Sequence, residues 1–242
     1  MTLLVLKYHR ARDGRDGNAV EMLDAHFEYI AATYHNVVPG DPLPPGKLSV
    51  CLSFDGGYFD FFAGVFPLLR KHTLTALLAI SPSVIRDDTP ASPGERLAIG
   101  SAAAYAQPAS GGFCTWPELE EMARSRHVVV AAHGYTHRPL NLAGADLDTE
   151  LHVPRTLIGT RLGVSVDSFV FPYGKIAGRS LREARSGYRY LFANGQGTNS
   201  GWHVRVLHRI GADNLRTPTE PFETGRRLYY QACSVWNRLR RR

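Results

Sequence analysis

Seven strand-like segments, separated by helix-like segments, constrain the fold of this chain more than any other feature. Each strand-like segment is a short run rich in Val, Leu, Ile, Phe or Ala. Strands that alternate with helices are typical of a parallel sheet covered by helices, and about seven strands in one domain favour a barrel over an open sheet. The expected strands are 3–8, 48–54, 74–80, 128–132, 168–171, 190–193 and 204–208.

The length of the chain fits one domain that spans residues 1–242. Residues 81–112 interrupt the alternation, because they are rich in Pro, Ser, Ala and Gly and exceed the ~12–15 residues usual for a structureless connection. We expect either a lid or substrate-binding insertion here, or a tolerated surface excursion. Thr115 and Glu118, with Pro117 between them, predict the start of a helix through a capping box.

The last helix is expected over residues 218–242, because Thr217-Pro218-Thr219-Glu220 repeats the same start signal. Four apolar residues recur along it at helical spacing, and we expect this stripe to pack on the core rather than on lipid. The stripe consists of Leu228, Ala232, Val235 and Leu239.

Several arginines behind the formal net charge of +6 lie in the C-terminal stretch. They are Arg226, Arg227, Arg238, Arg240, Arg241 and Arg242. A solvated helix end is the common explanation, but the cluster also allows a peripheral contact with an anionic membrane surface. No aromatic ladder or nucleic-acid motif accompanies the charge, so we expect no nucleic-acid partner. No segment approaches the ~20 apolar residues that span a bilayer.

The three cysteines are widely spaced and form no CxxC motif, which favours a reducing compartment over a disulfide framework or a thiolate metal site. Residues 1–7 predict a strand rather than an export signal, because no long apolar region with a small-residue cleavage site follows a basic start. We therefore expect a cytoplasmic protein, peripheral to the inner membrane where its basic C-terminus makes contact. The sequence predicts no particular oligomeric state.

A histidine pair directly follows one expected strand, in the segment His133-Gly134-Tyr135-Thr136-His137. Two imidazoles four residues apart lie on one face of a helical turn and can bind a single metal ion. A lone histidine is more often a hydrogen-bonded structural residue, but a pair at the end of a strand favours a metal site. Gly134 stands where a zincin protease has its general-base glutamate, so the pair predicts another kind of metal hydrolase.

Other polar residues also follow expected strands: His9, Asp55, the turn Pro172-Tyr173-Gly174, and His208. Active sites of parallel barrels are built at the carboxyl ends of the strands, where the loops converge. Asp55 precedes two glycines, and near a metal it could act as a general base or bind the ion itself. The alternative is a turn aspartate that accepts hydrogen bonds from its own backbone, as is common for Asp-Gly.

Three motifs give the chain a resemblance to the polysaccharide deacetylases of the NodB-homology group, carbohydrate esterase family 4. SFDGG at 53–57 is similar to TFDDG of that family, HGYTH at 133–137 to its HxxxH, and FPYGK at 171–175 to its proline-tyrosine-glycine turn. The similarity continues in order through almost the whole chain. Further similar segments are Tyr8-His9-Arg10, Thr115-Trp116, Gly187-Tyr188 and Leu207-His208-Arg209-Ile210.

The resemblance implies a deformed (β/α)7-type barrel that holds Zn²⁺, or another divalent ion such as Co²⁺, Ni²⁺ or Mn²⁺, and removes an N-linked acetyl group from a sugar. It implies that His133 and His137 are metal ligands. It also implies that Asp55 is the catalytic base and that the backbone N–H of Tyr173 is the oxyanion donor. Gly56 replaces the second aspartate of the family motif, which is normally a metal ligand.

Glycine offers no side-chain donor, and two imidazoles alone hold a hydrolytic metal loosely. Either Asp55 becomes the third ligand and the base comes from another group, or a carboxylate or histidine from elsewhere completes the site, or the metal is lost. Val170 stands where many relatives have an arginine that tethers the catalytic aspartate. His208 is expected to be the general acid because of its place near the end of the last strand, with a structural histidine as the alternative.

The sequence thus predicts a metal-dependent hydrolase that removes an N-acetyl group from a sugar, a nucleotide-linked sugar or a glycan precursor in surface polysaccharide metabolism. One alternative is a carbohydrate-binding protein with the same fold, whose metal centre has decayed at Gly56. Another is a hydrolase that acts on non-sugar C–N bonds, such as those of a cyclic amide. The substrate class depends on the resemblance, because the contacts of a pocket are not encoded in linear order.

Overall fold

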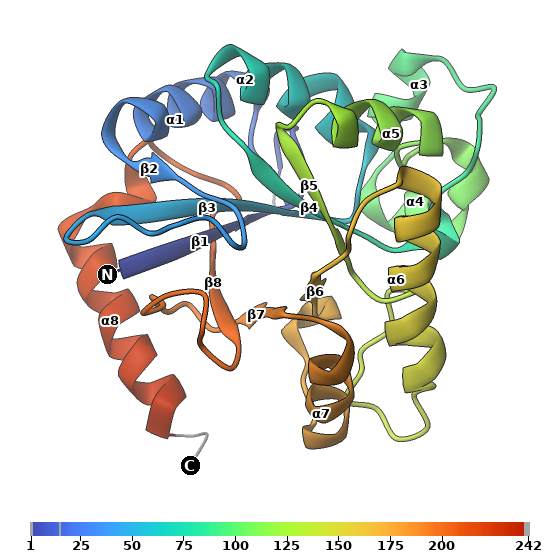
Figure 1. Ribbon diagram of the computed structural model, residues 1–242. Coiled ribbons are helices and arrows are strands. Elements are labelled where there is room, and N and C mark those ends of the chain that lie inside the picture. The colour runs from blue at the N-terminus through green and yellow to red at the C-terminus, as the bar shows by residue number, and fades with distance from the viewer. Residues whose placement is uncertain (1, 15, 240–242) are drawn as a thin grey trace.

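The computed structural model describes residues 2–14 and 16–239, which form parallel strands surrounded by helices (Figure 1). The strands are β1 (Thr2–Tyr8), β2 (His35–Asn36), β3 (Leu48–Asp55), β4 (Ala76–Ile80), β5 (Val128–Ala132), β6 (Ser168–Val170), β7 (Tyr190–Asn194) and β8 (Leu207–Gly211). The α-helices are α1 (Val20–Thr33), α2 (Phe66–Lys71), α3 (Pro93–Ala98), α4 (Ser101–Ala106), α5 (Trp116–Arg124), α6 (Leu147–Leu162), α7 (Gly178–Gly187) and α8 (Thr224–Leu239). No helix in these ranges is long and apolar enough to cross a membrane.

The strands close into a barrel because β1 pairs with both β8 and β3. The ring runs β1-β8-β7-β6-β5-β4-β3, and the short β2 pairs with the start of β3. The junction of β5 with β6 has a single residue pair, Ala132 with Phe169, whereas β1 and β3 share a continuous register from Thr2 to Tyr8. The predicted (β/α)7-type barrel is confirmed, and the sparse β5–β6 junction makes it irregular.

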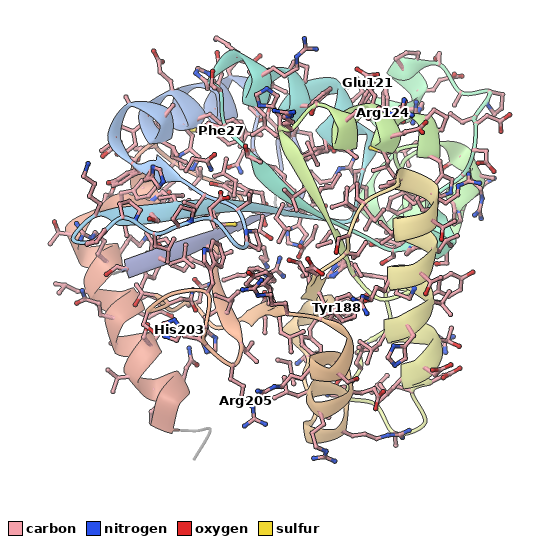
Figure 2. The ribbon with its side chains drawn as sticks, in the orientation of Figure 1. Phe27, Glu121, Arg124, Tyr188, His203 and Arg205 are labelled. Carbon is pink, nitrogen blue, oxygen red and sulfur yellow. The ribbon has the colours of Figure 1, made fainter. Side chains whose placement is uncertain are left out.

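The core has two layers because successive strand side chains point to opposite faces. One set, which includes Val5 and Phe192, fills the barrel interior. The other set, which includes Leu6 and Phe54, packs under the helices. Phe27 of α1 belongs to this outer layer and lies between its helix and the strands (Figure 2). The parity of a residue within its strand therefore decides whether its side chain can reach the barrel interior.

Two predicted boundaries near the C-terminus are wrong. β8 spans Leu207–Gly211, so it is shifted by three residues toward the C-terminus relative to the expected strand 204–208. The last helix begins at Thr224 rather than at 218, because Glu220–Phe222 forms a separate 3-10 turn first. The capping box before α5 is confirmed, with the Thr115 backbone N–H donating to the Glu118 carboxylate at 2.7 Å. Residues 240–242 of the predicted helix lie outside the described residues.

The predicted insertion at 81–112 is tied to the barrel by two buried arginines. Arg10 donates to the Ile99 carbonyl at 3.0 Å and to Ser101 Oγ at 3.1 Å. Arg96, which is only 6% exposed, donates to the Gly111 carbonyl at 2.8 Å within the insertion and to the Phe113 carbonyl at 3.0 Å just beyond it. Burying an arginine is costly unless its donors are satisfied, so these contacts hold the insertion in one position. Residues 81–112 therefore form an ordered wall at the mouth of the barrel rather than a loosely attached surface loop.

Candidate active site

A cavity of about 410 Å³ opens at the carboxyl ends of the barrel strands. The insertion closes one side of it with Ser101, Ala102 and Tyr105 from α4. The strand ends contribute Lys7, His9, Asp55, His133, Asn194 and Arg209. Sequence positions that are far apart therefore meet at the end of the barrel where parallel α/β barrels carry their active sites.

Asp55 is held by a bidentate pair with Arg209. Nη1 of Arg209 lies 2.5 Å from Oδ1 of Asp55, and Nη2 lies 2.9 Å from Oδ2. Burial opposes ionisation of Asp55, but the guanidinium and the nearby His133 overcome it and hold the pKa of this carboxyl well below its usual range. Arg209 thus supplies, from β8, the tether expected to be missing at Val170. In the sequence, Arg209 stood out only as a member of a segment similar to the family, Leu207-His208-Arg209-Ile210.

The predicted histidine pair comes together in the cavity. His133 Nδ1 donates to the Val170 carbonyl at 2.8 Å, which leaves Nε2 directed at the cavity, 4.0 Å from Oδ2 of Asp55. The His137 ring centre is 4.7 Å from that of His133. Burial lowers the pKa of His133 and lowers that of His137 to about 3. Both imidazoles are therefore neutral near pH 7, as metal ligands must be.

The histidines do not lie on the predicted helical turn. Residues 133–137 form an irregular loop in which Gly134 has φ +75° and His137 has φ +60°. These left-handed conformations turn the chain back so that the two rings meet. Tyr105 stacks on His137 with ring centres 4.7 Å apart, and the Tyr173 ring lies 4.8 Å from it. Tyr173 itself is 57% exposed at the mouth of the cavity.

His9 forms a second polar pair beside Asp55. Its Nδ1 lies 2.6 Å from Oδ2 of Asp213, and its backbone N–H donates to Oδ1 at 2.9 Å. The carboxylate fixes the ring so that Nε2 faces the cavity, 3.9 Å from Oδ2 of Asp55. A histidine oriented by a carboxylate is the geometry of a general acid–base catalyst. The sequence marked His9 as a polar residue after a strand and as part of the family-like segment Tyr8-His9-Arg10, but without a role, and Asp213 carried no signal.

His208 does not reach this cavity. Because β8 begins at Leu207, the alternation of side chains directs Arg209 into the barrel and His208 away from it. His208 instead lines a separate cavity with Thr198 and Ser234. The prediction that His208 lies at the active site is therefore wrong, and the cause is the three-residue shift of the strand.

The backbone conformation at position 56 and the neighbouring Tyr58 ring both favour glycine there. Its φ is +102°, and a Cβ at this position would lie 2.4 Å from Cε2 of Tyr58. The Tyr58 ring is fixed in turn, because it stacks on Phe113 and lies under the Arg10 guanidinium, 4.3 Å from its ring centre. An aspartate at position 56 would thus collide with Tyr58, so the usual second carboxylate is excluded by packing as well as by sequence.

The chemical nature of the remaining donor side chains, two imidazoles and a carboxylate, fits a divalent metal ion. In residues 2–14 and 16–239, no three His, Cys, Asp or Glu side chains already converge as a metal site. Ligands lie about 2.0–2.2 Å from zinc, so two of them are at most about 4 Å apart. The 4.0 Å between Asp55 and His133 is at this limit. Two neutral imidazoles, those of His133 and His137, and one ionised carboxylate are nevertheless the usual set for a hydrolytic metal.

Comparison with known proteins identifies the family. Residues 43–191 match the family model described as polysaccharide deacetylase. The chain belongs to this family, and the resemblance seen in the three motifs is confirmed.

Among curated proteins, the chain is 27% identical over 200 residues to the poly-beta-1,6-N-acetyl-D-glucosamine N-deacetylase of Escherichia coli K12. The match covers 71% of this chain and 28% of that protein. Among solved structures, a Streptococcus pyogenes deacetylase, PplD, has a TM-score of 0.70 at 20% identity and covers 90% of this chain and 95% of its own. A de-N-acetylase from Aggregatibacter actinomycetemcomitans has a TM-score of 0.69 at 21% identity, covering 91% and 98%. These structures share the fold.

Proposed function

We propose that this chain is a metal-dependent hydrolase that removes the N-acetyl group from a glucosamine-type unit of a glycan or glycan precursor. One observation carries the proposal: a neutral histidine pair, an ionised carboxylate and a carboxylate-oriented histidine face the same cavity. The E. coli relative, named for a polymer of N-acetylglucosamine, supports the substrate class. Family membership supports hydrolysis of an N-acetyl group.

In this proposal His133, His137 and Asp55 hold the ion. When bound, a divalent ion supplies Lewis-acid activation of the acetyl carbonyl and of water. Since Gly56 provides no oxygen, Asp55 is needed as the third ligand and is not free to be the base. Arg209 supports this assignment, because its bidentate pair fixes the carboxylate in its ionised form.

His9 then performs the proton transfers. Its Nε2 accepts a proton from the attacking water and later donates it to the departing sugar amine, while Asp213 holds Nδ1–H and the ring orientation. The backbone N–H of Tyr173 supplies the oxyanion contact that the family motif implies. The Asn194 side chain supports this turn by donating to the Tyr173 carbonyl at 3.2 Å. The exposed Tyr173 ring offers a flat apolar face to a sugar ring.

Acetate release from N-acetylglucosamine oligosaccharides tests the proposal. Protein stripped with a chelator should release no acetate, and added Zn²⁺ or Co²⁺ should restore release. His133→Ala should lose both bound metal and activity, since it removes one ligand. Turnover that persists in the stripped protein would rule out the metal-dependent mechanism.

A carbohydrate-binding protein without turnover is the second candidate. Tyr58 favours it, because this ring occupies the space where a second carboxylate would help to hold the metal. In that case elemental analysis would find no retained metal, and calorimetry would show sugar binding without acetate formation. Near-stoichiometric metal together with acetate release would eliminate this candidate.

A further inference from the structure

The apolar residues of α8 face outward. Leu228 is 62% exposed, Val235 is 56% exposed and Trp236 is 55% exposed, and Ala232 is exposed as well. The prediction that this stripe packs on the core is therefore wrong for the described members. The side chain of Leu239 lies outside the described residues. In Figure 1, α8 runs along the edge of the molecule, apart from the other helices.

Polar contacts set this orientation. The Thr198 backbone N–H donates to Ser234 Oγ at 2.7 Å, and Asn237 Nδ2 donates to the Gly195 carbonyl at 2.8 Å. Tyr230 is buried on the same inner face. An amphipathic helix normally turns its apolar stripe to the core. Here hydrogen bonds to the loop before β8 hold the polar face of α8 inward. The apolar face of the helix is therefore exposed on the surface.

The charge of the same segment indicates what covers this face. Residues 224–242 contain six arginines and no aspartate or glutamate. Arg226 forms an ion pair with Glu220, which lies before the helix, and Arg227 is exposed. Two copies of α8 packed together would bring two segments of the same positive charge close to each other, which is unfavourable. An anionic surface would instead attract the same arginines.

We infer that α8 binds an anionic lipid surface. Leu228, Val235 and Trp236 would enter the boundary between headgroups and acyl chains, and the flanking arginines would pair with lipid phosphates. Leucine, valine and tryptophan on one face of an arginine-rich helix are typical of helices that lie in the membrane interface. This surface is separate from the cavity of the proposed hydrolase.

Vesicle flotation of the full chain tests the inference. The protein should float with vesicles of phosphatidylcholine and phosphatidylglycerol but not with phosphatidylcholine alone, and binding should weaken as salt rises. The double variant Leu228→Gln with Val235→Gln should bind at least about tenfold more weakly, because it removes two inserted apolar side chains. Both residues are exposed, so the variant should retain the wild-type circular dichroism spectrum and melting temperature.

A matched control changes exposed leucines elsewhere. Leu97→Gln with Leu142→Gln, at positions 42% and 59% exposed, should bind vesicles like the wild type. Equal binding by the α8 variant and the wild type would overturn the inference, as would failure of the wild type to float with anionic vesicles. A wild-type dimer in sedimentation velocity that the α8 variant loses would assign the face to a second copy instead.

Discussion

At the scale of single residues, one step along β8 decides which side chain enters the site. Arg209 points into the barrel and bonds Asp55, whereas its neighbour His208 lines another cavity. His9, which directly follows β1, faces Asp55 in the cavity and takes, in the proposed mechanism, the role of general acid that was predicted for His208. The two histidines therefore make a matched pair for testing the proposed acid–base role.

We predict that His9→Ala lowers kcat for acetate release by about 100-fold or more, the usual contribution of a general acid–base group. His208→Ala should stay within about threefold of the wild type, because this ring is outside the cavity. Steady-state kinetics on N-acetylglucosamine oligosaccharides, with metal content measured for each variant, checks both values. Equal losses in the two variants would refute the assignment.

The conformation of Gly56 leads to a second prediction at this scale. Gly56→Ala should lower the free energy of unfolding by about 1–3 kcal/mol or more, because φ is +102° and the new Cβ meets the Tyr58 ring. Gly46→Ala is the control, since φ there is +72° but nothing lies within 4 Å of the added Cβ. Urea unfolding should show the larger loss for Gly56→Ala, and similar losses would show that Tyr58 does not restrict this position.

At the scale of elements, the insertion depends on Arg96. Besides its bond to Gly111, Arg96 pairs with Glu118 at 2.6 Å and stacks over Phe59, 3.5 Å from the ring centre. Through these contacts it joins α3 to the start of α5. Together with Arg10, Arg96 therefore holds the wall that carries Tyr105 into the cavity.

We expect Arg96→Met to destabilise the protein by about 3 kcal/mol, because it leaves buried carbonyls and Glu118 without their partner. Limited proteolysis should cut within residues 81–112 sooner than in the wild type. Arg124→Met removes an exposed pair with Glu120 and should change stability by less than about 1 kcal/mol. Equal protease resistance of Arg96→Met and the wild type would contradict the proposed anchoring.

At the scale of the whole molecule, His26 links the end of β1 to the segment that precedes α8. The Tyr8 hydroxyl lies 2.7 Å from His26 Nε2, and His26 Nδ1 donates to the Pro218 carbonyl. Burial lowers the pKa of His26 to about 4, from an ordinary value of 6.5. The unfolded chain therefore binds a proton that the folded chain excludes between these two pH values.

Stability should fall as the pH drops from 6.5 towards 4, with His26 contributing about 3 kcal/mol of the loss and little more below that range. His133 and His137 titrate in the same direction, so the contribution of His26 is read from the smaller slope of His26→Gln. Urea unfolding at several pH values provides both slopes. Parallel slopes for variant and wild type would exclude His26 as the cause.

The sequence alone determined the fold class and the rim of the barrel where the histidine pair and Asp55 meet. These features depend on short-range periodicity and on motifs at strand ends, both of which are written in consecutive residues. The tertiary structure decided the rest. His9 and Asp213 are 204 positions apart. The pairing of β8 with β7 decides which β8 side chains point into the barrel. Hydrogen bonds to a distant loop decide which face of α8 is exposed. Local patterns carry no information on such pairings, because only folding brings their partners within reach.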